Sequence, residues 1–498
     1  MKKNDSYNHI LRYTGLFGGV QGLNILVGIV RNKLVAMILG PDGMGLISLF
    51  NSTIKLVSDS TNFGVSVSAV KNISEDLDSG DEQMLEEHIK FVRSFSLLVG
   101  ILGMFLCIAL SPFLSKFTFS WDGHTLHFIF LSPIVALLAI TGGELAILKG
   151  LRELRGMAVI SIYNVIGALV TTIPLYYFFK EAAIVPSLVL MALIQMILTL
   201  FYSYKLYPLR LHYKWSFLTK GFSIIRLGIA FVLAGILGSG ADFLIRSYIN
   251  NVASIEMVGY YNAAYMMSMT YVGMVFAAME TDFFPRLSGS ANHSFTFNQT
   301  VSRQIEVMLL LVSPLLVVFS LCLPILLPLL YTGKFMPALG MIQAIVIAMY
   351  FRALKLPIQY IPLAKGDSLS YLLLEGIYDV LLVVFVIFCF NRFGLPGAGW
   401  GITLAGIMDF VVVVVYARLH YDYKPTYNVL LYSTIQIPIG ILVYFCAVSK
   451  NPIVYWGVGA MLFLISGATS ISILRTKTNL WRSLLRKINK RFGHHGED

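Results

Sequence analysis

A set of basic residues lies inside apolar segments that are long enough to cross a membrane. They are Arg31, Lys33, Lys55, Arg246, Arg352 and Lys355. A charge at the centre of a bilayer costs at least ~2.5 kcal/mol even on the most lenient insertion scale, so each needs a partner, a wet cavity or a route to the interface. Arginine grips phosphate with parallel N–H bonds and lysine acts as a point charge. The chemistry that these residues predict is therefore anion binding.

Polar residues continue from these cations along single helix faces. Spacings of three and four place Gln21, Asn24, Gly28 and Arg31 on one face, and Ser52, Lys55, Asp59, Asn62 and Ser66 on another. Lipid cannot satisfy such stripes, so they should line water. We predict that substrate-binding residues line a cationic cavity between two lobes, namely Arg31, Lys55, Arg246, Arg352, Lys355, Asn24 and Asn62.

Simpler interpretations stay open for several charges. Lys55–Asp59 and Asp242–Arg246 have i,i+4 spacing and could be neutral structural pairs. Lys33 and Arg246 could extend to the interface. Asp59, Asp379 and Asp409 are candidates for coupling transport to H+ or Na+. Asp409, which has no cation nearby in its own helix, could equally pair with a cation on a neighbouring helix.

The composition shows which elements must position these side chains. Hydrophobic residues make up 57% of the 498 residues, charged residues 13%, and the mean hydropathy is +0.76. Apolar runs near ~20 residues recur throughout, each long enough for a membrane-spanning helix. We predict an all-α integral membrane protein of about fourteen spans, at 10–39, 44–71, 94–115, 125–148, 157–179, 183–204, 222–249, 257–283, 304–330, 337–361, 369–390, 397–417, 428–448 and 453–474.

The distribution of basic residues predicts the orientation. If both termini are cytoplasmic, most lysine and arginine residues outside the spans fall on the cytoplasmic side, as the positive-inside rule requires. The residues left on the other side are Lys116, Lys180, Lys334, Arg392 and Lys450. The expected location is the cell inner membrane. Nucleic acid is not an expected partner, because the basic residues are scattered over many short loops.

An internal repeat organises the chain. Residues match at an offset of about 214, as in Gly45 and Gly259, Pro112 and Pro324, or Lys149-Gly150 and Lys365-Gly366. The repeat predicts two pseudo-symmetric six-helix lobes, because an even number of helices gives both copies the same orientation. The predicted divisions are an N-lobe at 1–210, a C-lobe at 221–422, two additional helices at 428–474 and a basic cytoplasmic tail at 475–498. The tail is either an interfacial helix on anionic lipid or a solvated segment.

No motif indicates an enzyme. The sequence contains no Gly-x-x-x-x-Gly-Lys-Ser/Thr loop and no His-Glu-x-x-His motif. Cys107, Cys322, Cys389 and Cys446 each fall within an apolar span, where they act as small hydrophobic residues. We expect neither an enzymatic activity nor a bound cofactor or metal.

Short motifs resemble a known family. Leu39-Gly40-Pro41-Asp42-Gly43-Met44-Gly45-Leu46, which follows Arg31-Asn32-Lys33, resembles the opening of the polysaccharide transporters, the Wzx-type flippases. Asn62-Phe63-Gly64-Val65, Lys71-Asn72-Ile73-Ser74-Glu75 and Leu148-Lys149-Gly150-Leu151-Arg152 also fit. These flippases belong to the multidrug/oligosaccharidyl-lipid/polysaccharide exporter superfamily.

The resemblance implies alternating access between two six-helix lobes. The implied cargo is an undecaprenyl-pyrophosphate-linked oligosaccharide, such as an O-antigen unit of lipopolysaccharide, moved from the cytoplasmic to the periplasmic leaflet. Implied partners are membrane lipids, a polysaccharide polymerase and glycosyltransferases. The two additional helices resemble those that form a lipid-tail groove in lipid II flippases. The alternatives are a cation-coupled drug or metabolite antiporter of the same superfamily, and a scaffold without transport activity.

Overall fold

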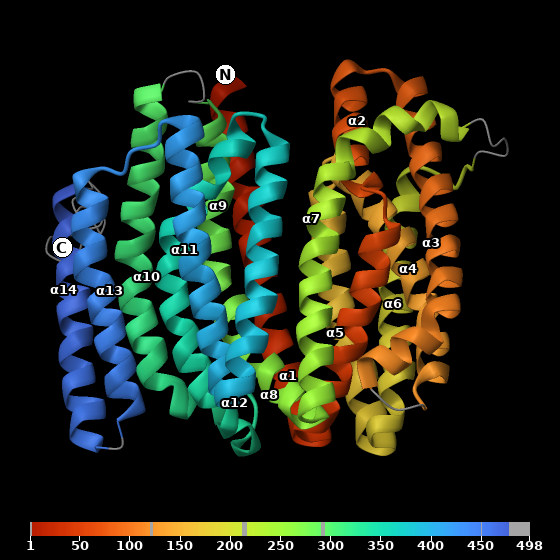
Figure 1. The fold of residues 1–498 in the computed structure, drawn as a ribbon. Coiled ribbons are helices and arrows are strands. Elements are labelled where there is room, and N and C mark those ends of the chain that lie inside the picture. The colour runs from red at the N-terminus through yellow and green to blue at the C-terminus, as the bar shows by residue number, and fades with distance from the viewer. Residues whose placement is uncertain (1, 120–122, 212–216, 290–293, 450, 478–498) are drawn as a thin grey trace, which may run out of the picture. The chain divides into compact units, whose positions relative to one another are not determined.

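The computed structural model describes residues 2–119, 123–211, 217–289, 294–449 and 451–477, and its regular elements there are all helical. Figure 1 shows their arrangement along the chain. The α-helices are α1 (Lys2–Thr61), α2 (Val65–Ser79), α3 (Glu82–Phe119), α4 (Thr125–Gly150), α5 (Leu154–Phe179), α6 (Ile184–Leu206), α7 (Phe217–Val252), α8 (Ile255–Tyr265), α9 (Gly273–Gly289), α10 (Ser294–Leu330), α11 (Leu339–Ala364), α12 (Ser368–Tyr421), α13 (Tyr427–Val448) and α14 (Gly459–Lys477). Short helical turns, η1 (Lys180–Ala183), η2 (Met266–Tyr271), η3 (Gly333–Ala338) and η4 (Ile453–Val458), join some of them.

The helices confirm the predicted all-α membrane fold. Ten stretches of the described chain are long and apolar enough to cross a membrane. Three of these overlap two predicted spans each, namely Gly22–Thr61, Leu154–Leu206 and Ser368–Tyr421. The predicted span 257–283 corresponds to α8, η2 and α9 together. The protein is therefore a multi-pass membrane protein with about fourteen spans.

Backbone breaks divide the longest helices where the sequence predicts separate spans. Gly40 (φ 68°) interrupts α1 and Gly394 (φ 62°) interrupts α12, and both are non-helical. One predicted boundary is wrong, because the span expected at 44–71 does not run through. Left-handed backbone at Phe63 and Gly64 ends the helix after Thr61, and α2 begins in its place.

The chain divides into two compact units. The first unit contains Met1–Ala263 and Leu327–Met336, and the second contains Ala264–Leu326 and Pro337–Asp498. The predicted lobes at 1–210 and 221–422 are based on the internal sequence repeat, and they stay a prediction. Of the tail at 475–498, residues 478–498 lie outside the described part of the chain.

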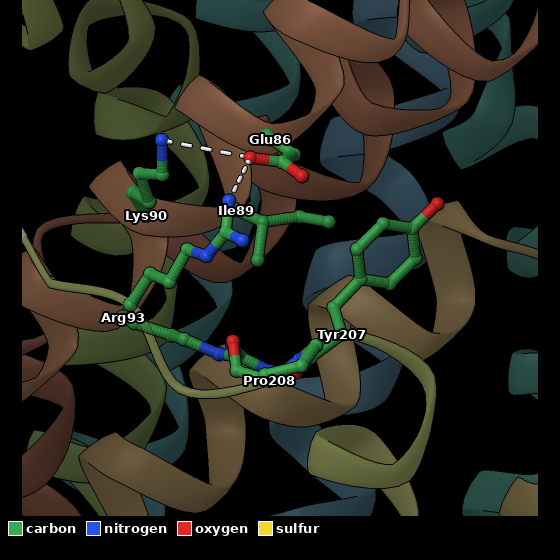
Figure 2. A pocket seen from close by; sticks show the side chains of 7 residues that line it. Glu86, Ile89, Lys90, Arg93, Tyr207 and Pro208 are labelled. Carbon is green, nitrogen blue, oxygen red and sulfur yellow. Dashed lines mark hydrogen bonds and ion pairs between the residues drawn. The ribbon is translucent and has the colours of Figure 1, made fainter.

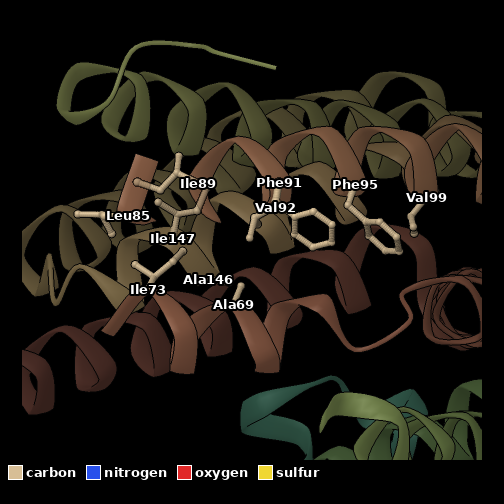
Figure 3. Close-up of a cluster of buried hydrophobic side chains, with 10 residues drawn as sticks. All are labelled: Ala69, Ile73, Leu85, Ile89, Phe91, Val92, Phe95, Val99, Ala146 and Ile147. Atoms are coloured by element: carbon tan, nitrogen blue, oxygen red, sulfur yellow. The ribbon is translucent and has the colours of Figure 1, made fainter. Parts of the chain in front are cut away.

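Part of the core of the first unit lies where α2, α3 and α4 meet (Figure 3). Ile73 of α2 and Ile147 of α4 are fully buried, and Leu85, Ile89 and Val92 of α3 pack with them. These α3 residues recur at helical spacing, so one face of α3 supplies them. The cluster holds α2, the helix that follows the break, against the two long helices.

A buried ion pair joins three helices of the first unit. Arg93 of α3 donates from Nε to Glu144 Oε1 of α4 at 2.9 Å, and the side chains are 2% and 3% exposed. The same guanidinium donates to the carbonyl oxygens of Tyr207 (2.9 Å) and Pro208 (2.8 Å), after α6. Ser203 of α6 also donates to Glu144. This network fixes the end of α6, and the sequence did not predict it because Arg93 counted only as a basic residue on the cytoplasmic side.

A small pocket borders Arg93 (Figure 2). Its volume of about 20 Å³ accommodates a water molecule but no substrate. Its lining residues are Glu86, Ile89, Lys90, Arg93, Tyr207, Pro208 and Arg210. The pocket therefore belongs to the structural network and is not a candidate binding site.

In the second unit, the two additional helices form a compact layer with α10. Figure 1 shows α13 and α14 side by side. Val317 of α10, Val443 of α13 and Leu462 of α14 are buried together. Gln436 of α13 donates to Ser470 Oγ at 3.1 Å and accepts from Ser466 Oγ at 2.7 Å, so its amide is satisfied inside the helix pair. The pair is thus an integral part of the second unit.

A reciprocal contact within the first unit reflects the internal repeat. A Cβ atom added to Gly45 would lie 2.1 Å from the carbonyl oxygen of Ile255, and one added to Gly259 would lie 2.0 Å from that of Pro41. Gly45 and Gly259 are equivalent at an offset of 214, and so are Pro41 and Ile255. Gly45 thus contacts Ile255, and its equivalent Gly259 contacts Pro41, the equivalent of Ile255. This exchange is the pattern of a twofold-symmetric contact.

Candidate functional site

The first unit contains a cavity of about 400 Å³ beside the part of α1 that follows the break at Gly40. The predicted residues Lys55 and Asp59 both line it. Its other walls come from α4, α5 and α6. The complete lining is Asn51, Ile54, Lys55, Ser58, Asp59, Ile134, Leu138, Asn164, Leu188, Met191, Ala192 and Gln195.

Lys55 and Asp59 face this cavity without forming a contact pair. Lys55 is exposed, and no ion pair or hydrogen bond of its ammonium occurs among the described residues. Lys55 and Asp59 therefore interact electrostatically without forming a close ion pair. Lys55 is available to a ligand.

Arg31 and Asn24 lie in the part of α1 that precedes Gly40 and point toward α5 and α6. Arg31 donates from Nη2 to Met191 Sδ at 3.0 Å and from Nε to Thr172 Oγ1 at 3.4 Å. Asn24 donates from Nδ2 to Ser161 Oγ at 2.6 Å. Neither lines the cavity directly, but Met191 does, so Arg31 lies behind one wall. Within the described chain, no carboxylate forms an ion pair with Arg31.

The second unit contains a cavity of about 230 Å³. Arg352 and Lys355 of α11 and Asp409 of α12, all predicted, line it together. The complete lining is Tyr265, Met269, Ala348, Met349, Arg352, Lys355, Leu356, Gln359, Glu375, Tyr378, Ile402, Gly406 and Asp409.

Two of the charges in this cavity neutralise each other. Lys355 Nζ forms an ion pair with Asp409, whose side chain is 1% exposed, and lies 4.6 Å from the centre of the Tyr378 ring. This is the pairing with a neighbouring helix that the sequence left open for Asp409. Gln359 donates to the second acid, Glu375. A role of Asp409 in ion coupling stays a prediction.

The neighbours of Arg352 are a thioether and an aromatic ring. Its Nη1 lies 3.6 Å from Met269 Sδ, and its guanidinium lies 5.6 Å from the centre of the Phe276 ring. Thioether sulfur is a weak acceptor. The described residues place no carboxylate within ion-pair distance of Arg352, so its hydrogen-bonding capacity is largely unused.

The remaining predicted residues are not among those that line the two cavities. Arg246 is 6% exposed, forms an ion pair with Asp242 at 2.7 Å and donates to Ser48 Oγ at 2.9 Å. It thereby packs α7 against α1, as expected for a structural pair. Asn62 lies in the break after α1, and Asp379 lies in α12. Their proposed roles in substrate binding and ion coupling are untested by this geometry.

The sequence comparison identifies the family. A family model described as polysaccharide biosynthesis protein matches residues 34–339. The chain belongs to this family. The matched range contains every residue of the first-unit cavity. A sequence search of curated proteins gives no match.

Solved structures share the fold of this polysaccharide biosynthesis family member. The lipid II flippase MurJ in an inward closed conformation aligns with a TM-score of 0.72 and 13% identity, over 94% of this chain and 99% of that one. An inward-facing multidrug resistance MATE transporter of the MOP superfamily aligns at 0.68 and 13%, over 80% and 94%. A MOP superfamily transporter from Pyrococcus furiosus, whose binding pocket is described as of reverse polarity, aligns at 0.56 and 15%, over 82% and 93%. At these identities the likeness shows the fold alone.

The two cavities of this family member occupy equivalent positions in the internal repeat. Adding 214 to most residues that line the first cavity gives residues that line the second. The equivalent pairs are Asn51 and Tyr265, Lys55 and Met269, Ile134 and Ala348, Leu138 and Arg352, Asn164 and Tyr378, Leu188 and Ile402, Ala192 and Gly406, and Gln195 and Asp409. The repeat therefore extends from the fold to the cavities, while the polar groups differ.

Sequence reasoning missed several cavity residues. The predicted stripe included Ser52, which is buried and donates to the carbonyl oxygen of Leu49, whereas Asn51 lines the cavity. Ser66, at the end of that stripe, has a side chain outside the described part. Asn164 and Gln195 carry no charge, so the membrane charges do not indicate them. Applying the offset of 214 to Asp409 would have indicated Gln195.

Metal binding finds no support in the described chain. No group of three or more histidine, cysteine, aspartate or glutamate side chains there is placed to hold an ion.

Proposed function

We propose that this protein is a flippase for a lipid-linked oligosaccharide. The cargo is an undecaprenyl-pyrophosphate-linked unit of a surface polysaccharide such as O-antigen. The chain resides in the cell inner membrane with both termini in the cytoplasm, and it moves the cargo from the cytoplasmic to the periplasmic leaflet by alternating access. Arg31 in the first unit and Arg352 in the second each act as a contact for the phosphates.

The observation that carries this proposal is the contrast between paired and unpaired cations. Lys355, Arg246 and Arg93 are matched to Asp409, Asp242 and Glu144. Arg31 and Arg352 have no carboxylate partner among the described residues.

Holding a charge in a membrane without a counter-ion is costly, so residues that do so are commonly functional. An anionic ligand supplies the missing partner. A pyrophosphate offers several oxygens to a guanidinium and suits this chemistry.

The comparisons support a lipid-linked cargo. The family is described as polysaccharide biosynthesis protein, and a solved structure that aligns over 94% of this chain is a lipid II flippase. The alternative, a cation-coupled drug or metabolite antiporter, gains support from the MATE fold. A cationic drug needs a free carboxylate. In the second cavity Asp409 is already neutralised by Lys355, so an antiporter would depend on Asp59 of the first cavity. Asp59 on the first cavity is the better candidate for H+ or Na+ coupling.

The test is flipping of undecaprenyl-pyrophosphate-N-acetylglucosamine by the purified protein in liposomes. Arg31→Gln and Arg352→Gln should each lower the flipping rate about 10- to 100-fold, because a charge-assisted hydrogen bond contributes roughly 1.5–3 kcal/mol. Arg31→Lys and Arg352→Lys should retain part of the activity. Arg392→Gln, a matched exposed arginine outside both cavities, should leave the rate unchanged.

Folding is checked by gel filtration of each variant. Wild-type flipping by well-folded Arg31→Gln and Arg352→Gln variants would contradict the proposed site. Export of cationic drugs by a protein that flips no glycolipid would instead establish the antiporter.

A further inference from the structure

The two equivalent cavities differ in the kind of polar group that they present. Where the second unit has Asp409 and Tyr378, the first has Gln195 and Asn164. Arg352 of the second unit corresponds to Leu138. At these positions the first cavity presents neutral amides and an apolar side chain where the second presents Asp409, Tyr378 and Arg352.

The amides of the first cavity have no hydrogen-bond partner among the described residues. Asn51, Asn164 and Gln195 form no side-chain hydrogen bond within the described chain. A primary amide offers two N–H donors and a carbonyl acceptor. In a membrane protein, leaving such groups without partners is costly, so they must face water or a ligand.

The charge on the cavity wall is balanced. Lys55 and Asp59 contribute one charge of each sign, and the other lining residues are neutral. This favours a neutral polar ligand over a free anion. Both charged groups can nevertheless bind hydroxyls, because lysine donates to oxygen and a carboxylate accepts from O–H.

From this arrangement we propose that the first-unit cavity is a carbohydrate subsite. Sugar hydroxyls donate and accept hydrogen bonds and so match the amides of Asn51, Asn164 and Gln195. The C–H faces of a pyranose ring match the aliphatic wall of Ile54, Ile134, Leu138 and Leu188. The volume of about 400 Å³ falls in the usual range for small-molecule pockets.

The inference rests on the proposed function, because it assigns the sugar portion of that cargo to the first unit. The inference assigns two parts of the cargo to different residues. Arg31 and Arg352 bind the phosphates, whereas the amides of the first cavity bind the oligosaccharide.

The first experiment compares two substrates in liposomes, undecaprenyl-pyrophosphate-N-acetylglucosamine and sugar-free undecaprenyl pyrophosphate. The double variant Asn164→Ala/Gln195→Ala should reduce flipping of the glycolipid about 10-fold, in line with the loss of two neutral hydrogen bonds, and should leave the sugar-free lipid unaffected. Arg31→Gln should impair both. Equal loss for both substrates, or no loss for either, would overturn the carbohydrate subsite while leaving the phosphate site intact.

A second experiment needs no transport. In a background with the native cysteines replaced, Asn164→Cys should react with a maleimide more slowly when N-acetylglucosamine, galactose, mannose or rhamnose is present. Arg392→Cys, outside the cavity, should react at the same rate with or without sugar. If no sugar in this panel protects position 164, the subsite is refuted even where flipping by Arg31 and Arg352 is established.

Discussion

Lys355 and Asp409 show what a membrane interior demands of a single charged residue. Their ion pair is shielded by the Tyr378 ring, and Asp409 is almost completely buried. In such a site the two charges are stable only together. Removing both and filling the space with apolar groups is often neutral, whereas removing one leaves an uncompensated charge.

We therefore expect Lys355→Met and Asp409→Asn to lower the free energy of unfolding by about 3–5 kcal/mol each. The double variant Lys355→Met/Asp409→Leu should recover most of the loss. The measurement is equilibrium unfolding in mixed detergent micelles. If the double variant is as unstable as the sum of the single ones, the pair does not act as a unit.

At this scale the sequence predicts residue types better than their partners. A charge in an apolar segment is visible from composition, so Arg31, Lys55 and Arg352 could be selected. Whether a charge is paired depends on helices far apart in sequence, as with Lys355 and Asp409. Asn164 and Gln195 could not be selected from composition, because a neutral amide in a span is common and carries no charge penalty; only the repeat offset applied to Asp409 indicates Gln195.

At the scale of elements, Asp367 secures both ends of α12. Its carboxylate accepts from the backbone N–H of Ser370 at 3.1 Å, which caps the first turn, and from the Tyr421 hydroxyl at 2.7 Å. Tyr421 is the last residue of α12. The kink at Gly394 allows the start and the end of this long helix to meet at one carboxylate.

These hydrogen bonds, first from Ser370 and then from Tyr421, hold the pKa of Asp367 below its ordinary value of 3.8. A lowered pKa means that the ionised cap stabilises the fold above pH 3.8 and that this stabilisation is lost as pH falls through the folded-state pKa. Asp367→Ala should cost about 1 kcal/mol at neutral pH, as for other helix caps. The difference in Tm between wild type and variant should narrow on acidification. A difference that stays constant down to pH 2 would exclude the ionised cap.

Hydropathy predicted the spans because each must cover the apolar thickness of a bilayer. It failed at Asn62–Gly64, where the break depends on left-handed backbone and not on polarity. It also missed the Arg93–Glu144 pair, because a buried pair near a helix end has the same composition as two solvated residues.

At the scale of the whole molecule, the repeat predicted from scattered matches extends to atomic contacts. Gly45 leaves space for the backbone carbonyl of Ile255, and Gly259 leaves space for that of Pro41. The two carbonyls are equivalent in the repeat, as are the two glycines. Neither position tolerates a side chain, since the atom that it meets is backbone. The two contacts lie in the first unit and share one helix crossing, between α1 and α8.

Gly45→Ala and Gly259→Ala should therefore have similar effects, each costing about 1–3 kcal/mol through overpacking. Because either methyl group separates the same two helices, the double variant should lose much less than the sum. Thermal unfolding of the three variants in detergent checks this. Gly289→Ala, which meets no atom within 4 Å, is the control and should be neutral. Full additivity of the two substitutions would show that the contacts are independent.

The same crossing has the symmetry of a contact between two subunits. In a twofold homodimer the two subunits use the same surface patch, so a residue of one subunit meets a second residue of the other, and the reverse contact also occurs. Such an interface is called isologous. Here both partners belong to one polypeptide. The crossing has the form that two identical half-length chains would adopt on pairing. Because the two halves belong to one polypeptide, their sequences need not be identical. The two cavities differ accordingly: the first combines Lys55 and Asp59 with amides, whereas the second holds Arg352 and the Lys355–Asp409 pair.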